Sequence, residues 1–207
     1  MAFQQATDGT IKHRMSGLET VEVATWKVNV KEAYNLTYIY TILHDWLVEE
    51  GWATKEEAEF PETYYQQRDN PNFGKELRIR WRLKRPSVEP ENKIFSYMMD
   101  IDFYTLGLKD TEITHKGQKI KADKSEFEIA CSAMVVIDRE GFIGKSIFKD
   151  FKKLLLERVL KQHFLMHKKA VYASSYRFRE FLLTYFKQAP FFPEKEGAEF
   201  YAKRTLE

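Results

Sequence analysis

The sequence contains a single cysteine among 207 residues, so the chain has no second thiol with which to form an internal disulfide. A chain without disulfides is typical of a reducing compartment, and we therefore expect a cytoplasmic protein. The one thiol, Cys131, lies inside an apolar run. In such a run a cysteine more often fills space in the interior than acts as a nucleophile.

Long apolar runs are missing as well. No stretch reaches the roughly 18 uninterrupted apolar residues that a membrane-spanning helix needs. Residues 1–17 lack the apolar segment of a secretory signal peptide. We therefore expect a soluble chain without a membrane span.

The chain has almost no excess of either charge. Its 33 basic and 31 acidic residues leave a net charge of +2, too small a field to steer the whole molecule toward a polyanion or a membrane. A charge-driven function therefore requires a local patch. The composition, 43% hydrophobic and 15% aromatic, is sufficient for one large core.

The sequence also lacks a recognisable catalytic or metal-binding motif. His163 and His167 have the i, i+4 spacing of helical metal ligands, but the intervening residues are apolar and no third ligand is near in sequence. Asp100 and Asp102 share one face of a predicted strand, where ion pairing with nearby arginines is favoured over acid–base chemistry. The sequence predicts no catalytic residue, no metal site and no cofactor. It leaves enzymatic activity open and favours a protein without one.

The N-terminal half of the chain alternates between strand and helix patterns. Residues 1–19 are polar and aperiodic, which predicts an arm, and residues 20–30 predict a strand with a bulge near Ala24 and Thr25. A helix is predicted over residues 31–51, ending at Gly51, and a short helix over residues 54–59 from the capping pair Thr54 and Glu57. The first helix carries an apolar stripe of Tyr34, Tyr38, Ile42 and Trp46, joined by Ile39, Leu43 and Leu47.

The centre of the chain is a succession of strand patterns. Residues 63–69 predict an edge strand, and residues 75–85, 93–104 and 118–138 predict longer strands, the last two joined by a tight turn at Lys116 and Gly117. The odd positions of residues 77–83, 95–103 and 127–137 are all apolar, so these positions are predicted to be buried. Residues 144–187 predict helix, either continuous or broken at residues 173–175, and residues 188–207 predict a tail. Residues 20–187 are accordingly predicted to be a single α+β domain.

A ladder of charge runs along the segment KELRIRWRLKRP, residues 75–86. Within residues 76–84 its even positions are charged and its odd positions are apolar. If this strand pairs with residues 93–104, Arg80 and Arg82 share a face with Asp100 and Asp102. Two hypotheses follow. Either the face neutralises itself in solvent, or the arginines await an acidic partner such as nucleic acid.

The order of elements resembles the helix-grip fold of the START and Bet v 1-like superfamily. The resemblance is carried by one strand, two helices, about six antiparallel strands and the long amphipathic segment at residues 144–187. It implies a curved antiparallel sheet of six to seven strands wrapped on a C-terminal helix, with a cavity for a small hydrophobic ligand between them. The turn NPNFGKE has one glycine and lacks the glycine-rich loop of the pollen-allergen branch. The cavity candidates are Trp81, Tyr97, Met99, Ile101, Cys131, Ala133, Phe151 and Leu155. The alternative is that these bulky residues simply fill a solid core.

The C-terminal helical segment is the most asymmetric in charge. Residues 144–187 carry eleven basic and three acidic residues, interleaved with aromatic ones. Such a helix could bind RNA, an anionic lipid surface or an acidic partner, or it could lie against the acidic remainder of its own chain. Arg and aromatic residues are common at interface hot spots. The candidate partner-binding residues are Lys168, Lys169, Tyr172, Tyr176, Arg177, Phe178, Arg179, Phe186, Phe191 and Phe192. Three hypotheses remain open: a binding or assembly module for a protein partner or for self-association, a helix-grip ligand binder or cyclase/hydrolase-like enzyme, and an RNA- or ribosome-associated factor.

Overall fold

The computed structural model describes residues 19–31, 33–56, 59–87, 94–115, 118–137, 158 and 160–186. They belong to two units, residues up to Ser175 and residues from Tyr176 onward. Several predictions lie outside the described residues: the arm at residues 1–18, the turn at residues 116–117, the helical segment at residues 144–157 and the tail at residues 188–207.

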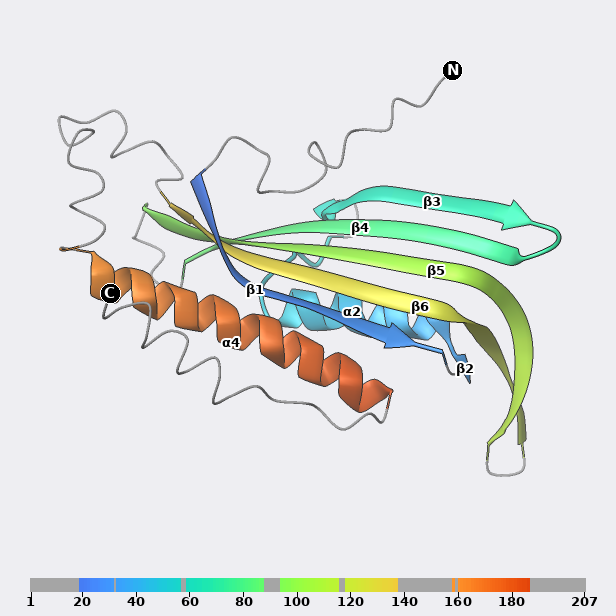
Figure 1. The fold of residues 1–207 in the computed structure, drawn as a ribbon. Coiled ribbons are helices and arrows are strands. Elements are labelled where there is room, and N and C mark those ends of the chain that lie inside the picture. The colour runs from blue at the N-terminus through green and yellow to red at the C-terminus, as the bar shows by residue number, and fades with distance from the viewer. Residues whose placement is uncertain are drawn as a thin grey trace, which may run out of the picture. The chain divides into compact units, whose positions relative to one another are not determined.

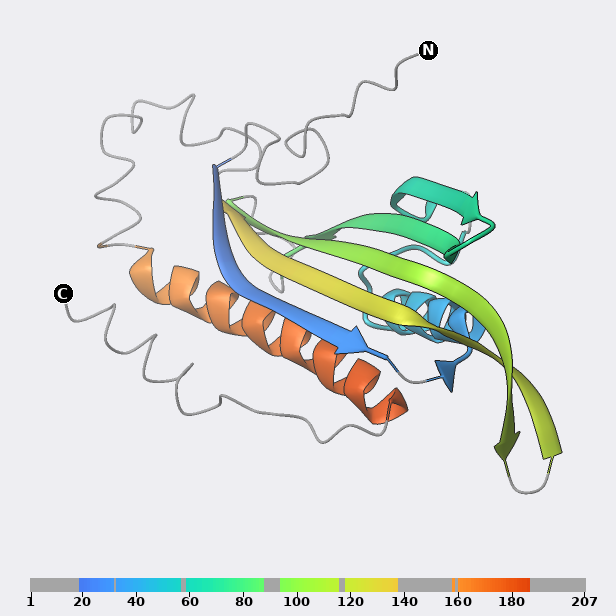
Figure 2. The same cartoon turned by 45° about the vertical axis from the view of Figure 1, so that its right-hand side comes forward.

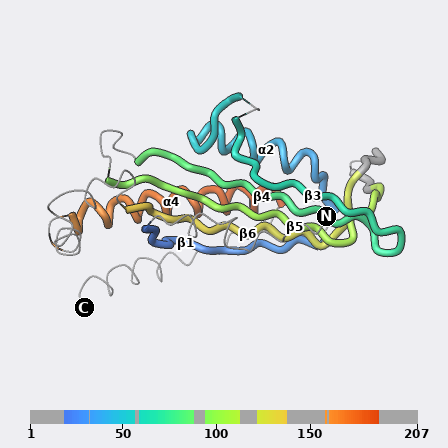
Figure 3. Tube along the Cα trace, turned by 90° about the horizontal axis from the view of Figure 1, so that it is seen from above, coloured from blue at the N-terminus to red at the C-terminus, as the bar shows by residue number. Residues whose placement is uncertain are grey.

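One curved antiparallel sheet dominates the first unit (Figure 1). Its strands are β1 (Glu19–Val30), β2 (Ala33–Tyr34), β3 (Glu62–Asn70), β4 (Gly74–Pro86), β5 (Phe95–His115) and β6 (Gln118–Ile137). The strands lie in the order β1-β6-β5-β4-β3, with β2 also paired to β6, and Figure 3 shows this succession from above. The described helices are α2 (Leu36–Glu49) and α4 (Lys161–Tyr185). The predicted α+β class and antiparallel sheet are confirmed, and β3 lies at an edge as expected.

The inner face of the sheet, formed by the odd positions of β4, β5 and β6, is the hydrophobic core. Every odd residue from Leu77 to Leu83, from Phe95 to Phe103 and from Phe127 to Ile137 is buried. Antiparallel pairing places them together, for example Trp81 opposite Ile101 and Ile101 opposite Cys131. Because a slip of one residue would turn all of these side chains to the other face, the apolar alternation sets the register.

Helix α2 packs on this inner face but begins later than predicted. Residues 33–34 form β2, and the helix starts at Leu36 with Asn35 as its N-cap, whose side chain accepts a hydrogen bond from Tyr38 N. The predicted apolar stripe is confirmed only in part. The buried residues are Ile39, Leu43 and Leu47, whereas Tyr38 is 54% exposed. The strand bulge of β1 lies between Glu22 and Ala24, slightly before the predicted position.

Helix α4 is continuous from Lys161 to Tyr185, so the alternative of a break at residues 173–175 was wrong. The two serines at that position do not interrupt the helix because their hydroxyls point into the core. Ser174 Oγ accepts a hydrogen bond from the Trp52 indole at 3.0 Å, and Ser175 Oγ accepts one from the Trp26 indole at 2.9 Å.

The outer face of the sheet was predicted to be solvated, and at one end this was wrong. Arg82 is 6% exposed and Asp100 is 3% exposed. Four further residues of the same face are also buried: Ser96, Met98, Met134 and Val136. Met98, Met134 and Val136 form a small apolar cluster of their own. The sheet therefore has a second, smaller core on its outer side.

Beyond residue 106, β5 and β6 bend toward the side on which α2 lies (Figures 1 and 2). The bend coincides with a register shift between Leu106 and Lys109 and with Gly107, whose φ of 70° favours glycine. Gly74 of β4 has a φ of 93°, and a Cβ there would lie 2.7 Å from the Leu108 carbonyl oxygen. Two glycines thus allow the start of β4 to lie directly against the bend.

Candidate functional site

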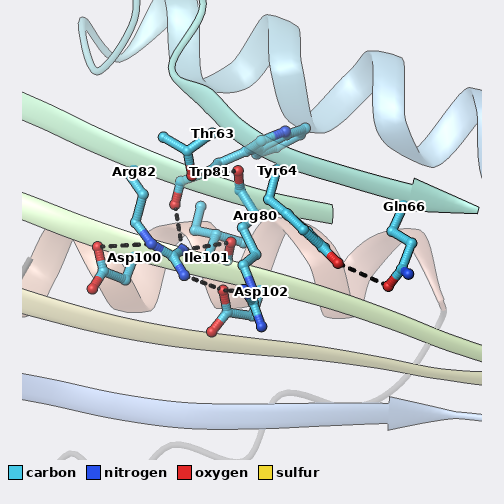
Figure 4. A network of polar contacts seen from close by, with 9 residues as sticks. All are labelled: Thr63, Tyr64, Gln66, Arg80, Trp81, Arg82, Asp100, Ile101 and Asp102. Carbon is cyan, nitrogen blue, oxygen red and sulfur yellow. Dashed lines mark hydrogen bonds and ion pairs between the residues drawn. The ribbon is translucent and has the colours of Figure 1, made fainter. Parts of the chain in front are cut away.

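The most concentrated polar arrangement is the charge ladder of β4 and β5 (Figure 4). Arg82 Nη2 lies 2.6 Å from Asp102 Oδ1, and Arg82 Nε lies 3.7 Å from Asp100 Oδ1. The guanidinium also donates to the carbonyl oxygens of Trp81 and Ile101, at 2.9 and 3.3 Å. The arginine is therefore fully engaged inside the protein, and the arrangement neutralises a buried charge.

The other arginines of the ladder have internal partners too. Arg80 lies 3.9 Å from Asp102 and stacks on the Tyr64 ring at 4.8 Å. Arg78 pairs with Glu76 at 2.8 Å and stacks on the Tyr104 ring at 5.1 Å. The predicted pairing of Arg80 and Arg82 with the carboxylates of β5 is confirmed. Because phosphate binding requires cations that are available to it, the ladder does not favour nucleic acid.

The same pattern continues on the far side of the outer face. Lys27 lies 3.0 Å from Glu128, and Lys31 lies 2.7 Å from Glu126. These two ion pairs join the end of β1 and the residue after it to β6 across a solvated surface, where water and salt screen them and their contribution to stability is small. The outer face is therefore a self-neutralising scaffold with a buried end.

The residues predicted to line a cavity fill the inner face. Six of the eight are no more than 2% exposed: Trp81, Tyr97, Met99, Ile101, Cys131 and Ala133. Phe151 and Leu155 lie outside the described residues. Trp81 shows how the space is used. Its ring packs edge-on against Tyr40 and Phe103 at 5.1 and 4.5 Å, and its indole donates to Glu62 at 3.1 Å. Such contacts favour a packed core.

A polar seam joins α4 to the inner face. His167 has no exposed surface, and its Nδ1 is hydrogen-bonded to the Tyr97 hydroxyl at 2.8 Å. Eight residues further along, Ser175 Oγ lies 3.8 Å from Cys131 Sγ. Burial raises the pKa of the Cys131 thiol to about 12, so it is not a nucleophilic thiolate near neutral pH. These contacts fix the position of this part of α4 on the inner face of the sheet. Sequence reasoning missed them because His167 was considered only as a metal ligand.

The histidines do not form a metal site in the described part of the chain. His163 is exposed whereas His167 is buried, so the i, i+4 pair does not act together. His44 Nδ1 lies 3.2 Å from Asp45 Oδ1, and its ring lies 4.3 Å from that of Phe60. Within the described ranges, no group of three or more His, Cys, Asp or Glu residues could hold a metal ion.

The candidate partner-binding residues differ in exposure. Lys169 and Arg177 are exposed, and Phe178 has no exposed surface and cannot contact a partner directly. Five others are partly exposed: Lys168, Tyr172, Tyr176, Arg179 and Phe186. Phe191 and Phe192 lie outside the described residues. No membrane-spanning helix is found among the described residues.

Two open hollows lie at the bend of β5 and β6. One, of about 530 Å³, is lined by Asn35, Thr37, Asp110, Thr111, Glu112, Ala122 and Asp123. The other, of about 320 Å³, is lined by Lys31, Phe73, Leu106, Gly107, Lys109, Lys124, Ser125 and Glu126. Sequence reasoning did not find them, because the bend depends on a register shift that the apolar alternation does not indicate.

Comparison of the chain with protein-family models, with curated proteins and with solved structures finds no match in any of the three. The functional argument therefore depends on the geometry of this chain alone.

Alkaline pH is expected to destabilise the fold. Burial is the main cause that raises the pKa values of Tyr34 and Tyr40 from 10.0, and of Cys131 from 9.0, each to about 12. The folded protein therefore holds these protons more tightly than the unfolded chain does. Their contribution is complete below pH 9.0 and is lost as the pH rises toward about 12. Urea unfolding at a series of pH values tests this; a midpoint that stays constant above pH 10.0 would contradict it.

Proposed function

We propose that this protein is a non-enzymatic binding or assembly module that presents helix α4 and the residues after it to a macromolecular partner. The observation that carries the proposal is the two-sided character of α4. One side of the helix holds buried residues, and the other is polar and basic. The reactive groups of the first unit, Cys131, Ser175 and His167, are used in packing and hydrogen bonding.

In the first unit, α4 separates core and solvent by helical period. His167, Val171, Ser174 and Ser175 are buried, whereas Gln162, Met166, Lys169 and Ala173 are exposed at spacings of three and four residues. In the second unit, Arg177, Glu180 and Thr184 continue the exposed positions. Five basic residues and one acidic residue in Lys161–Tyr185 make the helix cationic. A cationic helix face with an exposed methionine suits an acidic protein surface.

We retain the resemblance to the helix-grip fold as part of this proposal, together with a cytoplasmic location, which the single cysteine favours. The two alternative functions have less support. A ligand cavity conflicts with the near-complete burial of six of its predicted lining residues. Nucleic-acid binding by the sheet conflicts with the internal partners of Arg78, Arg80 and Arg82.

Native mass spectrometry of the full chain purified from its own host tests the proposal. The wild-type protein is expected to retain a protein partner that the Lys169→Glu, Arg177→Glu double variant loses, because the variant reverses the charge of the exposed side of α4. The control is the Lys55→Glu, Lys84→Glu variant, which makes the same change of charge at two exposed positions away from α4.

A wild-type protein that carries no partner, or a partner retained equally by both variants, would overturn the proposal. RNA in the retained complex, bound with a steep dependence on salt, would favour the ribosome- or RNA-associated alternative instead.

A further inference from the structure

The bend of β5 and β6 places like charges directly opposite one another. Lys109 of β5 pairs in register with Lys124 of β6, and the next residue, Asp110, pairs with Asp123. Because neighbouring residues of a strand point to opposite faces, the two lysines lie on one face of the bend and the two aspartates on the other. Like charges in direct opposition destabilise an antiparallel pair.

The two hollows agree with this assignment. The lysine pair lines the hollow on the outer side of the bend, together with Lys31. The aspartate pair lines the hollow on the inner side, beside Asn35 and Thr37 at the start of α2. Figure 2 shows the curvature of this bend. Its convex side is therefore cationic and its concave side is acidic.

The charges are not neutralised within the described part of the molecule. Lys109, Lys124 and Asp110 have no ion pair among the described residues, and Lys31, by contrast, is paired with Glu126. Asp123 accepts a hydrogen bond from Leu36 N at 2.9 Å, which leaves its negative charge in place. Each face of the bend therefore carries like charges that the described residues do not pair. The outer face of β4 and β5 differs, because there the chain supplies both the arginines and the aspartates.

Exposed apolar surface borders the cationic hollow. Phe73 is 70% exposed and Leu106 is 45% exposed, and both line it. Phe73 is held in place by its turn, because Asn70 Oδ1 accepts hydrogen bonds from Asn72 N and Phe73 N. A fixed, exposed aromatic side chain beside unpaired lysines is typical of an interface centre.

We propose that the occupant of each hollow is a second copy of this chain, with the convex, lysine-lined side of one bend nested in the concave, aspartate-lined side of the next. Charge and curvature are both complementary in this arrangement, and the contact covers Phe73. The two faces are different surfaces, so the contact is head-to-tail and continues into a ring or an open array. The inference deepens the proposed assembly function by naming its partner, and it uses no residue of α4.

Analytical ultracentrifugation of the full chain at low and high salt tests the inference, using two variants that each disable one face. Lys109→Glu with Lys124→Glu disables the convex side, and Asp110→Lys disables the concave side; Asp123 is left unchanged because it supports the start of α2. The wild type is expected to associate and to dissociate as salt is added. Each variant is expected to associate at least about tenfold more weakly.

A mixture of the two variants gives the decisive result. Each retains the face that the other lacks, so the mixture is expected to recover an association that neither variant shows alone. The control Lys55→Glu, Lys84→Glu should associate like the wild type. A monomeric wild type, or variants that associate as the wild type does, would overturn the inference. A two-fold dimer that survives both variants would do the same. Loss of the α4 partner in the Lys169→Glu, Arg177→Glu variant is a separate readout, so either proposal can fail alone.

Discussion

Replacing Arg82 with methionine is expected to lower the free energy of unfolding by about 3–5 kcal/mol, the typical result of removing one partner from a buried ion pair. Arg82 is 6% exposed, and it neutralises Asp100, which is 3% exposed, as well as Asp102. Methionine fills a similar volume, so the expected loss reflects the carboxylates left without their cation. Urea unfolding followed by circular dichroism measures it.

Arg80→Met is the matched control. It lies on the same face of the same strand and contacts the same Asp102, but at 3.9 Å and with a side chain that is 20% exposed. Its expected cost is below about 1 kcal/mol. A triple variant, Arg82→Met with Asp100→Leu and Asp102→Asn, removes the charges together and should recover most of the loss. Equal costs for Arg80→Met and Arg82→Met would show that burial does not govern the ladder.

The ladder also shows what the sequence could predict. The alternation of residues 75–86 and the carboxylates at Asp100 and Asp102 were sufficient to predict which strands pair and which charges meet, because a period of two leaves one register that buries every apolar residue. They were not sufficient to predict burial of the charged face. Charge reversal at Asp100 would cost little on a solvated face, whereas its 3% exposure predicts a large cost.

The start of α2 was mispredicted for a local reason. Residues 31–35 continue the apolar spacing of the helix, so Tyr34 fitted a helical stripe. In the structure its ring packs against Phe127 at 5.0 Å, and its hydroxyl shares a hydrogen bond with Ser125. A tertiary contact with β6 thus overrides the helical pattern, and the N-cap residue Asn35 marks the true boundary.

The hollows were not predictable from apolar alternation, because they depend on register beyond the shift between Leu106 and Lys109. The available signal was the pair of glycines. Gly74 and Gly107 interrupt strand patterns, and a glycine in a strand often marks a bulge or a close approach of backbones. Reading Gly107 in this way would have placed Lys109 opposite Lys124, and the like-charge pairs would then have been visible in the sequence.

Ending the chain at Ser174 is expected to abolish cooperative unfolding. If the segment beyond Ser174 served only as an interface, such a truncation would leave the domain folded. The structure gives a different expectation. Ser175 has no exposed surface and accepts the Trp26 indole hydrogen bond, and removing it leaves that donor buried without its partner.

A single substitution separates the loss of the Trp26–Ser175 hydrogen bond from the loss of the end of α4. Ser175→Ala removes only the hydroxyl that acts as the acceptor, and it is expected to cost about 1–3 kcal/mol. Thr184→Val removes a hydroxyl from an exposed position of the same helix and should cost less than about 0.5 kcal/mol. A chain ended at Phe186 keeps all of α4 and serves as the reference for the chain ended at Ser174. Cooperative unfolding of the chain ended at Ser174, at the wild-type urea midpoint, would contradict this expectation. It would show that the hydrogen bond of Ser175 is not needed for a stable sheet and that the part of α4 after Ser174 is available to a partner.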